Sequence, residues 1–146
     1  MTGKEKEEEL ICIGVGSNSI TKELLNIINP PINFEQQVIQ AGGQTIQLFG
    51  TSILDRRTQE KWVSAPQYDY GLIARLKNQK TNADILILVG LGPSGTTSTG
   101  YFISTHWRQI YDHLKMEKSF ERNFEVLLRT RNTDPTDVTL IKISTI

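Results

Sequence analysis

The hydrophobic residues of this chain are grouped in short runs, which glycine-rich and polar stretches separate. The first run, Leu10–Val15, is continuous and apolar, as expected for a strand that is covered on both faces. It is followed by the small polar turn 16–19 and by leucines and isoleucines at helical spacing over 24–28, which end before Pro30 and Pro31. The pattern therefore predicts a strand, a tight turn and a short helix.

The second half of the chain shows the same order of elements on a larger scale. The most hydrophobic stretch, 83–91, predicts a central strand. It leads through the glycine-rich loop 92–100 into a helical pattern. The apolar stripe of that helix consists of Ile103, Trp107, Ile110 and Leu114. One long helix is therefore expected after the loop.

Shorter apolar or alternating segments fill the middle and the end of the chain. The segments expected to form strands are 38–39, 44–49, 62–63, 70–76, 124–128 and 138–143. Turns are expected at Gly42–Gly43, over 55–61 and at Asp134–Pro135. The hairpin-like middle and the final pair of strands would add antiparallel edges to a sheet.

Strand–helix units at both ends of the chain, joined by right-handed crossovers, imply a mostly parallel sheet covered by helices. We therefore expect an α/β fold: a three-layer Rossmann-like or flavodoxin-like sandwich, with a mostly parallel sheet and antiparallel edge strands. Residues 10–146 suffice for one such domain. Residues 1–9, which hold a run of charges, are expected to form a disordered tail.

Composition and charge narrow the class of protein. Hydrophobic residues make up 38% of the chain and charged residues 22%, a balance typical of globular proteins. Sixteen basic and sixteen acidic residues cancel, which argues against a nucleic-acid partner. The single cysteine, Cys12, excludes an internal disulfide and indicates a reducing compartment. Because we find no signal-peptide pattern and no apolar stretch of membrane-spanning length, we expect a cytoplasmic protein without a membrane partner.

Two glycine-rich turns carry the candidate chemistry. Each follows a predicted strand and precedes a predicted helix, so both would lie at the carboxyl edge of a parallel sheet, where open α/β folds bind ligands. Helix N-termini offer unpaired amides there, and glycine lets the backbone approach an anion closely. The candidate ligand-binding residues of the two turns are Gly14, Gly16, Ser17, Asn18, Gly92, Ser94, Gly95, Thr96 and Thr97.

Neither turn matches a nucleotide-binding motif in full. The first begins as G-x-G, but Ser19 stands where the dinucleotide fingerprint has its third glycine. The second has no lysine after its glycine, so it is not a P-loop, and no G-x-S-x-G elbow activates Ser94. Hydroxyls and amides without lysine suit a ribose, a carboxylate or a single phosphate. The alternative is that the glycines only permit tight turns and that the hydroxyls cap helices.

Asp69 and Tyr70 are the other candidate site residues. The Asp69 carboxylate could accept hydrogen bonds from ribose hydroxyls or act as a base, and Tyr68 or Tyr70 could stack on a ring. The alternative is a turn aspartate between packed tyrosines. His106 and His113 lie seven residues apart on one predicted helix, which is too far for a shared metal ion, so no metal site is expected.

Three segments together resemble a poorly characterised Rossmann-like domain that occurs attached to bacterial regulatory and multidomain proteins. They are the G-x-G-S-N turn 14–18, the Asp-Tyr-Gly segment 69–71 and the G-x-x-x-x-G-T turn 90–96. The first turn departs from the pattern of that family, because Gly16-Ser17-Asn18 stands where Gly-Pro and a later Asn are expected. The resemblance implies a Rossmann-like fold and no particular activity. The site residues that it favours are Asn18, Asp69, Tyr70 and Thr96.

These observations favour a domain that binds or senses a small nucleotide-like or anionic ligand; they specify no cofactor. One alternative is a small hydrolase or transferase acting on a nucleoside or NAD-like substrate, with Asp69, Glu23 or Asp55 as its acid–base group. The lack of a convincing acid–base constellation argues against an enzyme. The other alternative is a structural or oligomerisation domain, in which Trp62 or the edge strand 138–143 marks an interface. Each reading is compatible with a homo-oligomer or with a partner in a larger system.

Overall fold

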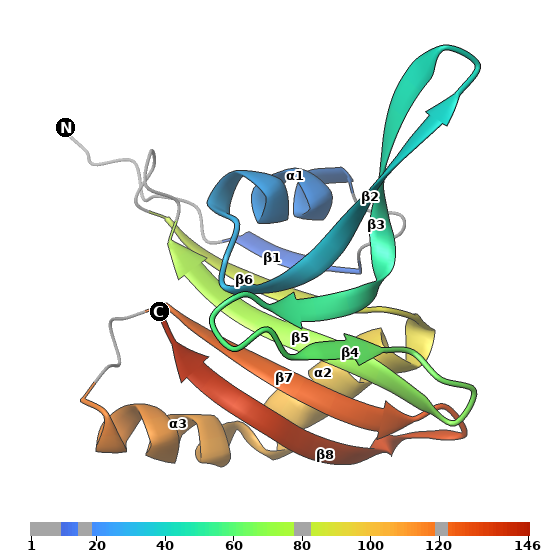
Figure 1. Cartoon of the computed structure of the whole chain (residues 1–146). Coiled ribbons are helices and arrows are strands. Elements are labelled where there is room, and N and C mark those ends of the chain that lie inside the picture. The colour runs from blue at the N-terminus through green and yellow to red at the C-terminus, as the bar shows by residue number, and fades with distance from the viewer. Residues whose placement is uncertain (1–9, 15–18, 78–82, 119–122) are drawn as a thin grey trace, which may run out of the picture.

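The computed structural model describes residues 10–14, 19–77, 83–118 and 123–146, shown in colour in Figure 1. The helices in these ranges are α1 (Ser19–Ile28), α2 (Pro93–Thr105) and α3 (Trp107–Met116). The strands are β1 (Leu10–Ile13), β2 (Ile32–Ala41), β3 (Gln44–Asp55), β4 (Lys61–Val63), β5 (Tyr68–Lys77), β6 (Asp84–Gly90), β7 (Phe124–Arg131) and β8 (Asp134–Thr145). The described chain is therefore richer in strand than in helix.

Five strands form the central sheet, in the order β1-β6-β5-β7-β8. The pair β1–β6 is parallel, whereas β5–β6, β5–β7 and β7–β8 are antiparallel. It follows that β1, β6 and β7 run in one direction and that β5 and β8 run in the other. The α2–α3 connection thus joins two strands of the same direction, β6 and β7, with β5 inserted between them.

A second, antiparallel sheet consists of β2, β3 and β4. Most of it is the long hairpin of β2 and β3, which a two-residue turn closes at Gly42 and Gly43. The φ angles of these glycines, 60° and 78°, are both positive, as a type I′ turn requires. The sequence therefore located this turn correctly, although the strands on either side are longer than expected.

The outer part of this hairpin extends beyond the rest of the molecule (Figure 1). The strand register shifts between Phe34 and Gln36, where extra residues of β3 form a bulge that bends the ribbon. Beyond the bulge, the two strands pair regularly from Gln36–Phe49 to the turn. We call residues 36–49 the arm.

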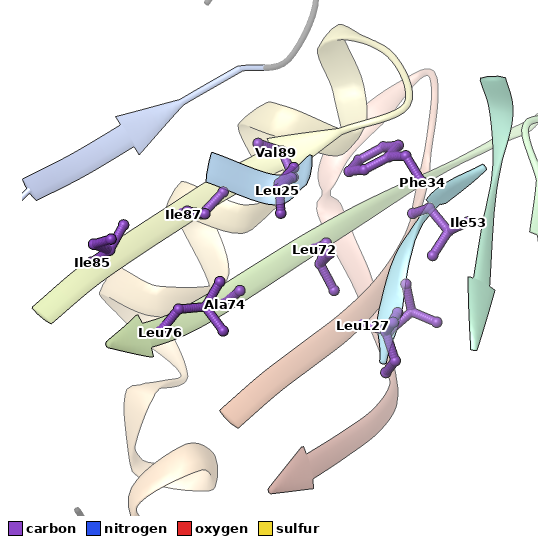
Figure 2. Close-up of a cluster of buried hydrophobic side chains, with 11 residues drawn as sticks. Leu25, Phe34, Ile53, Leu72, Ala74, Leu76, Ile85, Ile87, Val89 and Leu127 are labelled. Carbon is purple, nitrogen blue, oxygen red and sulfur yellow. The ribbon is translucent and has the colours of Figure 1, made fainter. Parts of the chain in front are cut away.

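The central sheet is covered on both faces, which explains why its inner strands read as continuous apolar runs. On one face, α1 and the small sheet pack over alternate residues of β5, β6 and β7 (Figure 2). The buried side chains of this layer are Leu25, Ile32, Phe34, Ile53, Leu72, Ala74, Leu76, Ile85, Ile87, Val89 and Leu127. On the other face, α2 and α3 pack on the sheet, and the buried side chains of this layer are Ile73, Leu88, Phe102, Ile110, Leu114, Phe124, Val126 and Leu128.

The expected Rossmann-like or flavodoxin-like sandwich with a mostly parallel sheet is wrong, because three of the four pairings in the central sheet are antiparallel. The observed fold differs from the expected one in how the chain connects its strands. After α1, the chain does not return to the central sheet but forms the hairpin of β2 and β3 over its face. β5 then enters the sheet antiparallel to both of its neighbours. Apolar patterning identifies strands and helices but does not encode the order in which strands pair.

The expected single long helix is two helices, α2 and α3, with a break at His106 (φ −123°, ψ 19°). The hydroxyls of Ser104 and Thr105 donate hydrogen bonds to the carbonyl of Tyr101, at 3.0 and 2.6 Å. Such bonds compete with the backbone ladder and bend helices. As a result Trp107, which the predicted stripe placed in the core, is 50% exposed.

Candidate functional site

The carboxyl ends of β1 and β6 meet at one edge of the central sheet, because these strands are parallel neighbours. At this edge the amide of Gly14 donates a hydrogen bond to the carbonyl of Leu88 at 2.9 Å. The second glycine-rich turn begins shortly after, at the end of β6. The other candidates of the first turn, Gly16, Ser17 and Asn18, lie outside the described residues. That the two turns converge on one pocket stays a prediction.

Asp69 holds the N-terminus of α2. The residue is 3% exposed, and its Oδ2 accepts a hydrogen bond from the amide of Gly95 at 2.7 Å. Its Oδ1 accepts two more, from the hydroxyl of Ser64 at 3.0 Å and from the amide of Tyr70 at 2.9 Å. The anion that the positive end of a helix attracts is thus supplied by the chain itself.

Glycines allow β5, β6 and α2 to touch through their backbones. A Cβ atom on Gly95 would lie 2.1 Å from the carbonyl oxygen of Tyr70, and one on Gly71 would lie 2.5 Å from the carbonyl oxygen of Gly95. A Cβ atom on Gly90 would lie 2.2 Å from the amide nitrogen of Thr96. All three distances are too short for any side chain. The Asp-Tyr-Gly segment and the second glycine-rich turn are therefore two halves of one packing contact.

The hydroxyl candidates of the second turn lie near backbone carbonyls. Thr96 Oγ1 donates to the carbonyl of Gly92 at 3.2 Å, which ties the hydroxyl to the first turn of α2. Ser94 Oγ reaches the carbonyl of Asn132 at 3.4 Å. Thr97 is exposed on the helix surface. At the start of α2, the hydroxyls of Ser94 and Thr96 therefore hydrogen-bond to backbone carbonyls of the chain itself.

The expectation of a Rossmann-like nucleotide- or ligand-binding site has no support in these contacts. In such a site, a helix after a parallel strand presents free amides to a phosphate. Here α2 begins with Pro93, which has no N–H, and the amide of Gly95 is bonded to Asp69. Tyr70, expected to stack on a ligand ring, packs half-buried against the core. The broader expectations of a small anionic ligand and of an enzyme stay predictions that these contacts do not test.

The base of the hairpin is held by two polar residues of the central sheet, one on β7 and one on β8. Ile32 of β2 and Asp55 of β3 form the register pair at this base. The amide of Ile32 donates to Oε1 of Glu125 on β7 at 2.9 Å. Oδ2 of Asp55 accepts a hydrogen bond from Nζ of Lys142 on β8 at 2.8 Å. Polar contacts therefore fix both strands of the hairpin where it meets the central sheet. We call these contacts of Ile32 with Glu125 and of Asp55 with Lys142 the joint.

Glu125 is fully buried, and among the described residues its second oxygen, Oε2, has no hydrogen-bond partner. Burial raises the pKa of this carboxyl to about 8 from an ordinary 4.5, against the lowering effects of the Ile32 amide and of Arg57. Glu125 is therefore protonated at neutral pH. Glu125 is not among the residues predicted from the sequence, where the only signal is one acidic residue inside the apolar run Phe124–Leu128.

A cluster of charged residues surrounds Lys142 at the joint. Lys142 Nζ lies 2.8 Å from Asp55 Oδ2, 3.0 Å from Glu60 Oε1 and 5.4 Å from the centre of the Trp62 ring. Burial works against the ionised form of Asp55, but hydrogen bonds from Lys142 and from the amide of Arg57 outweigh it and lower the pKa. Asp55, considered above as an acid–base group, is thus an ion-paired anchor. Trp62, considered as an exposed interface residue, is half-buried in this joint.

The arm differs from the base of the hairpin in its sequence. The chain carries no charged residue between Glu35 and Asp55, and the arm contains no proline. Within the described residues, β4 pairs with β3 only over 52–54, so both outer edges of the arm lack a neighbouring strand. Natural proteins usually protect such edges with charges, prolines or a covering element. The arm is therefore an open, uncharged β-ribbon.

The described ranges contain no group of three His, Cys, Asp or Glu residues placed to hold a metal ion. His106 stacks on Phe102 with ring centroids 5.2 Å apart, and His113 Nε2 lies 3.2 Å from Glu117 Oε1. Both histidines therefore have contacts that account for them. Nor does the described part of the chain contain a helix with the length and apolarity to cross a membrane.

Comparison with protein-family models, with curated proteins and with solved structures gives no match for this chain. The class is therefore defined by the fold and its contacts: a mostly antiparallel domain whose small sheet carries a projecting arm. The resemblance to a Rossmann-like domain of bacterial regulatory proteins stays a prediction. Two of its three segments, 69–71 and 90–96, meet in the packing contact around Asp69.

Proposed function

We propose that this domain is a structural module that associates with itself, and that the arm is its binding element. The observation that carries this proposal is the arm: an uncharged hairpin that extends from the body and has two open edges. A two-stranded hairpin is only marginally stable in water, and another strand along one edge would add main-chain hydrogen bonds. This supports the oligomerisation alternative.

The joint at the base of the hairpin supports the same function. Glu125 and Lys142 hold Ile32 and Asp55, so the direction of the hairpin is set relative to the central sheet. A binding element that is held in place loses less conformational entropy when it associates. The polar contacts of the joint would therefore favour assembly, because they hold the hairpin in one direction before it binds.

A shortened arm tests the proposal. Deleting 38–41 and 44–47 removes four residue pairs and leaves Gln37 and Leu48 beside the same glycine turn. Because an even number of residues is deleted from each strand, the side chains of the remaining pairs stay on the same faces of the hairpin. We expect the mass of the wild-type protein in light scattering to rise with concentration, and the shortened protein to stay monomeric at the same concentrations.

The matched control is Gly42→Asn, which keeps the length of the arm, because asparagine tolerates the positive φ of this turn. It should assemble like the wild type. All measurements include a reductant, since the single cysteine indicates a reducing, cytoplasmic setting and Cys12 could otherwise link two copies. A wild-type protein that is monomeric at every concentration would overturn the proposal, as would a folded short-arm protein that assembles unchanged.

A further inference from the structure

The central sheet has two edge strands, β1 and β8, and they differ in protection. β8 carries Asp134, Pro135, Asp137 and Lys142, and its register with β7 shifts twice. Charges, proline and bulges of this kind prevent pairing with another chain. β1 reads Leu-Ile-Cys-Ile, without a charge or a proline. Of the strands that the structure describes, only β6 pairs with β1, so no described strand lies along its outer edge.

β1 also leaves apolar side chains uncovered. Ile11 is 63% exposed and Ile13 is 58% exposed. Their register partners on β6 are Leu86 and Leu88, so both isoleucines lie on the face of the sheet that α2 and α3 cover further along. The strand therefore offers main-chain groups that no described strand pairs with, and an apolar surface beside them.

An occupant of this edge must supply a strand and must not bring charge against Ile11 and Ile13. The arm meets both conditions, because each of its strands is uncharged and has an outer edge along which no described strand pairs. The arm of the same copy extends away from the body, so the strand would come from a second copy (Figure 1). One contact between copies would then pair the main-chain groups at the outer edge of the arm with those at the outer edge of β1.

Building on the proposed self-association, we propose that the arm of one copy adds as a strand to the free edge of β1 in the next copy. Each copy then carries one donor, the arm, and one acceptor, the β1 edge. The contact joins two different surfaces, so the association is head-to-tail and produces a closed ring or an open filament. The partner of the arm is thus this chain itself, at the edge of its central sheet.

The acceptor is tested with Ile11→Lys, which places a charge on the β1 edge at an exposed position. We expect this variant to weaken self-association at least about tenfold, since a charged edge strand opposes pairing. The matched control is Ile27→Lys, which changes an isoleucine that is 68% exposed on α1 and should assemble like the wild type. Thermal unfolding of both variants shows whether they are folded. If Ile11→Lys does not fold, Ile13→Lys replaces it as the test of the acceptor edge.

Mixing gives the decisive measurement. The short-arm protein retains an acceptor but no donor, and Ile11→Lys retains a donor but no acceptor. Each should be monomeric alone, and their equimolar mixture should form a 1:1 dimer that grows no further. If the mixture stays monomeric, or if folded Ile11→Lys assembles unchanged while the short-arm protein does not, the β1 edge is not the acceptor although the proposed role of the arm stands. If the short-arm protein also assembles, both proposals fail.

Discussion

At the scale of single residues, the Asp69 carboxylate combines three hydrogen bonds with a position at the start of α2. Two of the donors are backbone amides, of Tyr70 and Gly95, and the third is the Ser64 hydroxyl. A buried carboxylate with this set of donors stabilises the folded state through charge-assisted bonds and through the helix dipole. Its position in a distinctive sequence segment therefore has a structural explanation.

We expect Asp69→Ala to lower the free energy of unfolding by about 3 kcal/mol, because it leaves the buried amide of Gly95 without an acceptor. Chemical denaturation measures this loss. The control Asp112→Ala removes an exposed aspartate from α3 and should change stability by less than about 0.5 kcal/mol. Equal effects of the two substitutions would contradict the role assigned to Asp69.

Glu125 makes the stability of the fold depend on pH. The pKa of its carboxyl is about 8 in the folded protein and near 4.5 when exposed, so the folded state holds a proton that the unfolded state releases between these values. The stabilising contribution is complete below pH 4.5 and is lost as the pH rises towards 8. Charges near this carboxyl come from Arg57, Asp55 and Arg56.

Glu125→Gln should remove this dependence while keeping an oxygen that can accept the hydrogen bond of the Ile32 amide. We expect the stability of the variant relative to the wild type to rise by about 1.4 kcal/mol per pH unit between pH 5 and pH 8. Urea unfolding at several pH values measures it, and the other titrating groups cancel in the comparison. A difference that is independent of pH would show that Glu125 is ionised in the fold.

At the scale of elements, the seating of α2 on β5 and β6 depends on backbone contact, so its glycines are not equivalent. Gly95 touches the carbonyl of Tyr70, whereas a Cβ atom on Gly100 would meet nothing within 4 Å. Both glycines lie in the same helix. They therefore form a matched pair that separates close approach from helix propensity.

We expect Gly95→Ala to destabilise the protein by about 3 kcal/mol, because the added methyl group pushes α2 off the sheet. Gly100→Ala should stabilise it by roughly 0.5 to 1 kcal/mol, since alanine favours the helix and the space is open. The melting temperatures of the two variants should move in opposite directions. A small effect of Gly95→Ala would mean that α2 can shift without cost.

The sequence identified most elements because their residues follow simple periods. Strands over 70–76, 83–91 and 124–128 are apolar runs, and they form the inner strands of the central sheet. The break at His106 was not predicted, because the apolar stripe continues through it while hydroxyls end the helix. A helical period therefore does not by itself show that one helix spans it.

The candidate site was located better than it was interpreted. Asp69, Gly95 and their neighbours do come together, but the contact between them lies across β5, β6 and α2, and local sequence does not show which element meets which. Glu125 was missed for the same reason. Its environment is created by β2 and the turn after β3, which are far from it along the chain.

At the scale of the whole molecule, the sequence suggested helices packed on a sheet but not the direction of its strands. β1, β6 and β7 do run the same way, as strand–helix units suggest, yet β5 separates β6 from β7 and makes the sheet mostly antiparallel. Which strand lies between two others is decided by long-range packing. The projecting arm was equally hidden, because nothing in its composition distinguishes a covered hairpin from an uncovered one.

The position of β1 also has a consequence for biosynthesis. Leu10 pairs with Ile85, whereas β7 meets β8 directly after a short turn. On the ribosome, β1 emerges before the other described strands, and the only one of them that pairs with it, β6, is translated much later. Closing so long a loop is slow compared with forming local hairpins. We therefore expect β1 to be among the last strands to dock, so that the newly made chain exposes both of its edges while the rest of the sheet takes shape.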